Sequence, residues 1–138
     1  MEHIPGNPNP FSPLGLGCWQ YHPELWTAAQ EHALIEMMET ALVHGIDHFD
    51  TATGYGKGAS ERLVGRFLKG RRSRVFVATK AGIQDENPQT MLESVHLSLE
   101  RLDTDYIDLY YIHWPRSDMD IRPAMEGLEL ARAARRVV

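Results

Sequence analysis

Residues 45–68, GIDHFDTATGYGKGASERLVGRFL, contain a complete strand–loop–helix unit. The apolar stretch 46–50 is short enough for a strand, and the segment from Ser60 onward has the spacing of an amphipathic helix. Ser60 is the candidate N-cap, because its side-chain oxygen can accept a hydrogen bond from the first helical turn. The loop between them begins with a carboxylate, Asp50, and carries Tyr55 between glycines. A simple connection needs neither group, so this loop is a candidate functional site.

The same alternation of strand and helix recurs along the rest of the chain. Strands are expected at 14–20, 46–50, 74–80 and 106–114, and helices at 28–43, 60–68, 88–102 and from Pro123 onward. Gly45 is placed to end the first helix and Pro88 to open the third. Residues 1–13 are rich in proline, asparagine and glycine, and an irregular segment is expected there. Short apolar strands that alternate with amphipathic helices predict parallel strands joined by right-handed crossovers.

Four such β-α units correspond to half of a (β/α)8 barrel, the TIM barrel, whose usual length is about 250 residues. The chain has 138 residues, so we expect a single α/β domain, residues 1–138, built as a half barrel. A small doubly wound sheet is the competing fold. A half barrel leaves its first and fourth strand edges uncovered, and such edges associate readily. We therefore expect a homodimer in which two copies close one barrel.

Composition and charge exclude several classes of protein. The chain is 43% hydrophobic and 24% charged, which is typical of globular proteins. No apolar run approaches the roughly 20 residues of a membrane-spanning helix, and the N-terminus does not resemble a signal peptide. The net charge of -5 argues against a nucleic-acid partner, and the basic segment 69–74 is interpreted as the solvated end of a helix. The single cysteine, Cys18, is expected to be a packing residue and fits a reducing compartment, the cytoplasm.

Four polar side chains stand where the predicted strands end. Asp50, Lys80 and His113 end the second, third and fourth strands, and Tyr55 follows the second. In a parallel sheet these groups gather at the carboxyl edge, where α/β folds build their sites. Singly, Asp50 is explained as a turn cap and Lys80 as a solvated strand end. Tyr55 and His113 are singly explained as packed aromatic residues. Their coincidence on one edge favours a functional site.

The chemistry that these four side chains can perform is specific. A free tyrosine has a pKa of about 10 and is a poor acid at neutral pH. A neighbouring ammonium stabilises the phenolate, and a carboxylate keeps the ammonium charged and in place. A histidine across the pocket can hydrogen-bond a carbonyl oxygen. The residues therefore predict a proton-donating site for carbonyl reduction with Tyr55 as the general acid. The sequence has neither the spacing of a zinc site nor a Rossmann or P-loop motif.

Three segments of the chain resemble the first half of an aldo-keto reductase, in that family's order and spacing. They are DHFDTATGYGKGASERLVGRFLKG at 47–70, RVFVATKAG at 74–82 and SLERLDTDYIDLYYIHWP at 98–115. The resemblance extends from about Leu14 to about Leu130. It places the family's catalytic Asp, Tyr, Lys and His on Asp50, Tyr55, Lys80 and His113. Trp19 matches a position that lies near the nicotinamide or substrate in the family, and we assign Gln20 and Trp114 to the same pocket.

The resemblance implies NADPH-dependent reduction of a small-molecule aldehyde or ketone. Two features depart from the family pattern. Ile46 and Asp47 replace an aromatic–arginine pair that is common in one version of the motif. The chain also ends after the fourth β-α unit, whereas in the family much of the cofactor binding comes from residues of the second half. The tail 131–138, ARAARRVV, begins where a full-length relative would continue into its fifth strand.

Several hypotheses are compatible with a chain that ends after the fourth β-α unit. The chain is expected either to form the barrel-closing homodimer or to be a truncated product without a competent NADPH site. It could also be a cofactor-independent isomerase, dehydratase or cyclase, since Tyr55 and His113 can polarise a carbonyl and move protons without a hydride. A binding or regulatory subunit is the non-enzymatic alternative. The complete set of four residues argues against it, because binding alone requires no Lys80 beside Tyr55.

Overall fold

The structure is a computed structural model that describes residues 1–21 and 28–138. It contains four strands, β1 (Gly15–Gly17), β2 (His48–Asp50), β3 (Phe76–Ala81) and β4 (Leu109–Ile112). The α-helices are α1 (Ala28–Val43), α2 (Ala59–Leu68), α3 (Pro88–Leu102) and α4 (Arg122–Ala133), and short 3-10 helices are η1 (Tyr55–Gly58) and η2 (Arg72–Arg74). No helix in the described part of the chain is both long enough and apolar enough to cross a membrane.

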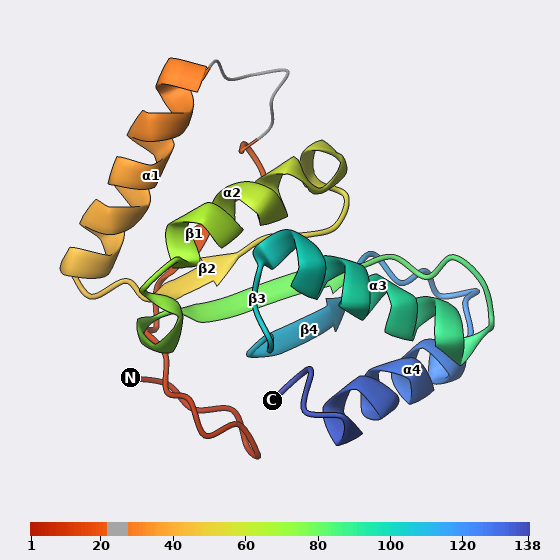
Figure 1. The fold of residues 1–138 in the computed structure, drawn as a ribbon. Coiled ribbons are helices and arrows are strands. Elements are labelled where there is room, and N and C mark those ends of the chain that lie inside the picture. Colours follow the sequence, from red (N-terminus) through yellow and green to blue (C-terminus); the bar gives the residue numbers. More distant parts are fainter. Residues whose placement is uncertain (22–27) are drawn as a thin grey trace.

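The four strands form one parallel sheet in the order β1-β2-β3-β4, which confirms the predicted topology (Figure 1). All four strands therefore present their carboxyl ends at the same edge. The strands are shorter than the sequence predicts, and β2 and β3 lack the first two residues of their predicted ranges. Single backbone bonds extend the pairing at the carboxyl edge, as where the Thr51 amide donates to the Ala78 carbonyl at 2.9 Å.

The two faces of the sheet have different surroundings. One face packs against the helices and contributes Phe49, Val77 and Tyr110 to the buried core. Because strand side chains alternate, the other face carries a second set: His48, Asp50, Phe76, Ala78, Lys80, Leu109 and Tyr111. We call this second face the inner face. Phe11 of the N-terminal segment packs on its amino-terminal part, with its ring centroid 4.5 Å from that of Phe76 and 5.2 Å from that of His48.

The helix boundaries confirm two predictions and correct a third. Helices α1 and α3 have the bounds expected from the sequence, and Gly45, with φ +83°, follows α1 in the left-handed conformation. Ser60 is not the N-cap of α2. That position is taken by Gly58 at φ +86°, and Ser60 is buried inside the helix, where its hydroxyl donates to the Cys18 carbonyl at 2.8 Å. The Ser60 hydroxyl therefore bonds a backbone carbonyl that is distant in the sequence and does not cap the helix.

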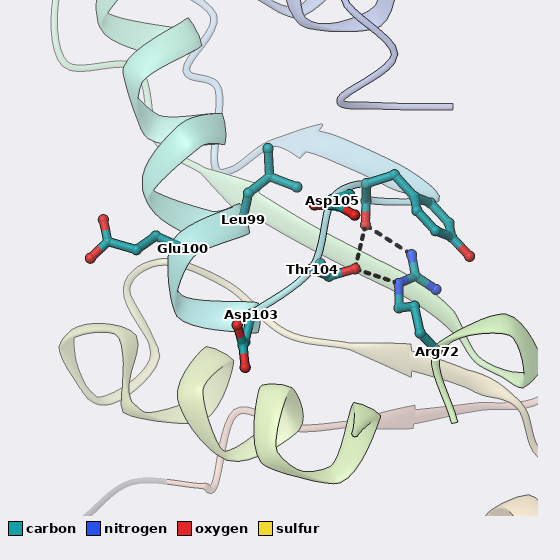
Figure 2. Close-up of a pocket in the computed structure, with 7 residues that line it drawn as sticks. Arg72, Leu99, Glu100, Asp103, Thr104 and Asp105 are labelled. Carbon is teal, nitrogen blue, oxygen red and sulfur yellow. Dashed lines mark hydrogen bonds between the residues drawn. The ribbon is translucent and has the colours of Figure 1, made fainter. Parts of the chain in front are cut away.

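Within the basic segment 69–74, Lys69 and Arg74 are exposed, as expected of a solvated helix end, but Arg72 is not. The side chain of Arg72 is only 17% exposed, and its Nη2 donates to Asp108 at 2.7 Å. Asp108 is buried, and its side chain also accepts from the Val77 amide at 2.8 Å. Figure 2 shows Arg72 beside a hollow of about 490 Å³ at the amino ends of β3 and β4. This hollow lies at the edge of the sheet opposite the predicted site.

The last residues of the chain pair with Ile107, which precedes β4. Ile107 and Val137 form a parallel bridge, the Ile107 amide donates to the Arg136 carbonyl at 2.9 Å, and the Val138 amide donates to the Ile107 carbonyl at 3.1 Å. Residues 136–138 therefore run parallel to the segment that leads into β4, whereas residues 131–133 of the tail still belong to α4.

Candidate active site

An ion pair between Lys80 and Asp50 forms the centre of the site. In the ladder Asp50 lies opposite Ala78, so Lys80 stands two residues further along β3 on the same face. Its ammonium reaches back to pair with Asp50 and also donates to the Thr51 carbonyl at 2.9 Å. The Lys80 side chain is 12% exposed, so these acceptors replace most of the water that an ammonium requires.

Tyr55 lies beside this pair in the loop that follows β2. The Lys80 ammonium is 5.1 Å from the centroid of the Tyr55 ring, which is within cation–π range. The loop is attached to the end of β3, because the Thr53 amide donates to the Lys80 carbonyl at 3.0 Å and its hydroxyl to the same oxygen at 3.2 Å. The strand that carries the ammonium therefore also holds the loop that carries the phenol.

The backbone after Tyr55 follows an unusual path. Gly56, Lys57 and Gly58 all have left-handed conformations, with φ of +56°, +54° and +86°. Glycine adopts this region readily, whereas the same conformation costs Lys57 about 1–2 kcal/mol. We call residues 51–58 the Tyr55 loop. Its sharp turn leads the chain from the sheet edge directly into α2.

His113 approaches Tyr55 from the end of β4. It lies one residue beyond the strand, and its amide donates to the Ala81 carbonyl at 2.8 Å. Its ring meets the Tyr55 ring edge to face, with centroids 5.8 Å apart and planes at 83°. Burial, and then the charge of Lys80, lower the pKa of His113, while Asp50 opposes the shift. The imidazole is therefore neutral at neutral pH and offers one N–H as a donor.

The predicted pocket residues lie at the same edge of the sheet. Trp114 is 82% exposed, and its ring stacks on that of His113 at 5.6 Å. Trp19 lies two residues beyond β1 with 63% of its surface exposed, and Gln20 beside it is half-buried. The structure thus brings Trp114 against His113, and it places Trp19 and Gln20 after the end of β1.

Sequence reasoning missed two contributors to the site. Tyr111 pairs with Lys80 in the ladder and shares the inner face, and burial and the charge of Asp50 raise its pKa. Strict alternation over 109–113 could have identified it, because Tyr111 lies two residues before His113. Thr51 contributes through its backbone carbonyl, which accepts from Lys80. No side-chain pattern in the sequence could have indicated that contact.

Arranged in this way, the side chains can bind a carbonyl oxygen and exchange a proton with it. A phenol and a neutral imidazole face each other, and an ammonium lies over the phenol ring. No cluster of metal-ligating side chains occurs within residues 1–21 and 28–138. A phenol, an imidazole and an ammonium in this arrangement are suited to acid–base chemistry.

Known proteins match most of this chain. The aldo-keto reductase YhdN of Bacillus subtilis is 42% identical over 128 residues, covering 86% of this chain and 39% of that protein. Methylglyoxal reductase YeaE of Escherichia coli is 33% identical over 104 residues, covering 75% of this chain and 36% of the relative. The chain thus spans about 40% of the length of these curated relatives.

Solved structures agree with the sequence matches. The glycerol dehydrogenase AKR11B4 from Gluconobacter oxydans superposes with a TM-score of 0.86 at 31% identity, covering 98% of this chain and 45% of that one. An aldo-keto reductase from Klebsiella pneumoniae in complex with NADPH gives a TM-score of 0.79 at 33% identity, covering 89% of this chain and 42% of that one. The four β-α units are therefore half of a (β/α)8 barrel. Since the model of the aldo/keto reductase family matches residues 13–134, the chain belongs to that family.

Proposed function

We propose that this chain carries the acid–base machinery of an NADPH-dependent aldehyde or ketone reductase. One observation carries the proposal: the Lys80 ammonium lies between the Asp50 carboxylate and the Tyr55 ring, and His113 faces that ring. A structural ion pair at a strand end needs neither a phenol nor an imidazole beside it. The names of two relatives, methylglyoxal reductase and pyridoxal reductase, support a small carbonyl compound as substrate.

In this mechanism each residue has one role. The substrate carbonyl oxygen accepts hydrogen bonds from the Tyr55 hydroxyl and from the neutral His113 imidazole, which fix its orientation. As negative charge develops on that oxygen, the Tyr55 hydroxyl transfers its proton to it. The Lys80 ammonium stabilises the resulting phenolate. Asp50 holds the ammonium in position through their ion pair.

The described residues fit the nicotinamide end of the cofactor. Trp19 and Trp114 expose 63% and 82% of their surfaces after β1 and β4, and an exposed indole can stack on a flat ring. We propose that these two residues, with Gln20, bound the nicotinamide and substrate pocket. When bound, NADPH supplies the hydride to the carbonyl carbon, and the protein residues supply orientation and the proton.

The proposal extends to assembly. We propose that the chain acts as one half-barrel domain and that two copies associate through their inner faces and edge strands. Tyr111, 42% exposed on the inner face, and the edge of β4 beyond the Ile107–Val137 bridge are surfaces that such a partner would cover. The free, buried Cys18 is compatible with the reducing cytoplasm, which we propose as the location.

The first test measures NADPH binding by tryptophan fluorescence on protein whose oligomeric state has been fixed by light scattering. We expect micromolar binding by a dimer, followed by turnover of small aldehydes. Replacing Tyr55 by Phe should reduce that turnover by about 10²–10⁴-fold and leave NADPH affinity unchanged, because it removes only the general acid. Tyr106→Phe is the matched control, because Tyr106 lies at the opposite edge of the sheet against Arg72. No binding at millimolar NADPH, or equal losses in the two variants, would refute the proposal.

A further inference from the structure

A second buried ion pair lies on the helix side of the Tyr55 loop. Glu61, in the first turn of α2, is completely buried, and both of its carboxylate oxygens are occupied. Its Oε1 accepts from the Thr79 hydroxyl at 2.8 Å, and its Oε2 accepts from Arg101 Nη1 at 3.1 Å. The pair therefore joins α2 to α3 and also contacts β3, at the residue that precedes Lys80.

The guanidinium of Arg101 also contacts the Tyr55 loop directly. Its Nη1 donates to the Thr53 carbonyl at 3.4 Å. It also fills the space beside Gly58, where an added Cβ would lie 2.5 Å from the Arg101 Cζ. These contacts fall two residues before and three residues after Tyr55, so Arg101 touches the loop on both sides of the phenol.

The chemistry of this pair is poorly explained by stability alone. Replacing a buried ion pair by well-packed apolar residues is often neutral or stabilising. Arg101 Nε is in addition buried without a hydrogen-bond partner among the described residues, which is itself unfavourable. The Tyr55 loop, in contrast, contains three successive left-handed residues and has to be held by its surroundings. A charged nitrogen, Arg101 Nη1, that donates to a carbonyl and to a carboxylate at once supplies such a hold.

We infer that Glu61 and Arg101 are positioning residues that hold Tyr55 in place for proton transfer, an inference that rests on the function proposed above. Arg101 acts through Thr53 and Gly58, and Glu61 acts by fixing the guanidinium. Thr53 in turn donates to the Lys80 carbonyl, so the pair sets the loop relative to the strand that carries the ammonium. Neither Glu61 nor Arg101 reaches the reacting atoms.

The test compares two conservative variants, Arg101→Lys and Arg72→Lys. Lysine is one bond shorter than arginine and lacks the planar fork, so at position 101 it cannot fill the space beside Gly58 while reaching both acceptors. Arg72 is the matched control: its side chain is 17% exposed and its partner Asp108 1%, against 15% and 0% for Arg101 and Glu61. The control pair lies at the opposite edge of the sheet.

The first readout is the NMR cross-peak between the ring protons of Tyr55 and His113, which requires neither cofactor nor substrate. We expect Arg101→Lys to lose this cross-peak with its other core cross-peaks intact, and Arg72→Lys to keep it. If both variants keep the cross-peak, or both lose it, the positioning role is overturned. Should Arg101→Lys fail to fold, Glu61→Gln replaces it, since glutamine keeps the acceptor for Thr79, and the same outcomes apply.

The second readout uses turnover. We expect Arg101→Lys to lower kcat by about 10²-fold with KM unchanged, which is the cost of misplacing a catalytic group by about 1 Å. A rise in KM at unchanged kcat would contradict the inference. If the wild-type chain shows no turnover at all, the proposed function fails, while the NMR comparison still decides whether Arg101 positions the loop.

Discussion

The Lys80–Asp50 pair is buried unevenly, and this asymmetry makes a sharp prediction about stability. The Lys80 side chain is 12% exposed, whereas that of Asp50 is 34% exposed. Asp50→Asn leaves an ammonium that is largely shielded from water and has no counter-charge, with only neutral oxygens, such as the Thr51 carbonyl, as acceptors. Lys80→Met leaves a carboxylate that water can reach and keeps most of the apolar volume. Asp50→Asn should therefore be the more destabilising change.

The magnitudes follow from two limits. Removing one partner of a fully buried pair costs about 3–5 kcal/mol, and an exposed pair contributes about 0–1 kcal/mol. We place Asp50→Asn at about 2–3 kcal/mol, near the buried limit, and Lys80→Met at about 1 kcal/mol, near the exposed limit. The double variant has no unpaired charge and should lose only about 1 kcal/mol, which gives a coupling energy of about 2–3 kcal/mol.

The assay is urea unfolding of the wild type and the three variants at pH 7 and low salt. The pair Arg116–Asp118 provides the matched control, because its side chains are 66% and 70% exposed and lie 3.0 Å apart. The same cycle there should give a coupling energy that cannot be distinguished from zero. A coupling energy for Lys80 and Asp50 within about 0.5 kcal/mol of zero would refute the reasoning. So would a larger loss in Lys80→Met than in Asp50→Asn.

Two further predictions concern pH and packing. Burial is the main cause that lowers the pKa of His113 and of His48 in the folded chain. In the unfolded chain both histidines have a pKa of about 6.5, so as the pH falls the unfolded chain takes up protons before the folded chain does. The free energy of unfolding should decrease from pH 7 to pH 5 in urea titrations. The double variant His48→Gln and His113→Gln should flatten that slope. An unchanged slope would contradict the assignment of the pH dependence to these two histidines. Gly127→Ala should cost about 1–3 kcal/mol despite the better helix propensity of alanine, because its Cβ would lie 2.3 Å from the Pro88 carbonyl oxygen. Gly54→Ala, with no heavy atom within 4 Å, should change thermal stability by less than about 0.5 kcal/mol, and equal effects at the two glycines would refute the packing argument.

The parts of the fold that could be predicted from sequence are those with local causes. Helix α3 begins at Pro88, where Asn87 accepts a hydrogen bond from the Gln89 amide at 3.1 Å, and such a cap is visible in the sequence. Gly45 marks the end of α1 for a similar reason. The expected gathering of Asp50 and Lys80 followed from parallel topology and side-chain alternation, because both depend only on the order of strands.

The parts that could not be predicted depend on tertiary partners. Ser60 has the side chain of an N-cap, but its hydroxyl donates to Cys18, a residue 42 positions away. Glu61 is favourable in the first turn of any helix, and nothing local indicates that Arg101 lies 40 residues further along to pair with it. Gly65 offered a weak signal, since a glycine inside a helix often marks a close approach; an added Cβ there would lie 2.8 Å from the Arg101 carbonyl oxygen.

Taken together, these contacts explain why a carboxylate and a tyrosine share one short loop. Two cations hold the Tyr55 loop from opposite sides of the sheet: Lys80 donates to the Thr51 carbonyl from the inner face, and Arg101 donates to the Thr53 carbonyl from the helix side. Each cation has its own carboxylate, so neither is left as a buried unpaired charge. Of these two cations, only Lys80 lies over the phenol ring, so the two ion pairs have different tasks. The inner pair can take part in proton transfer, while the outer pair keeps the loop in a conformation that its own residues would not maintain.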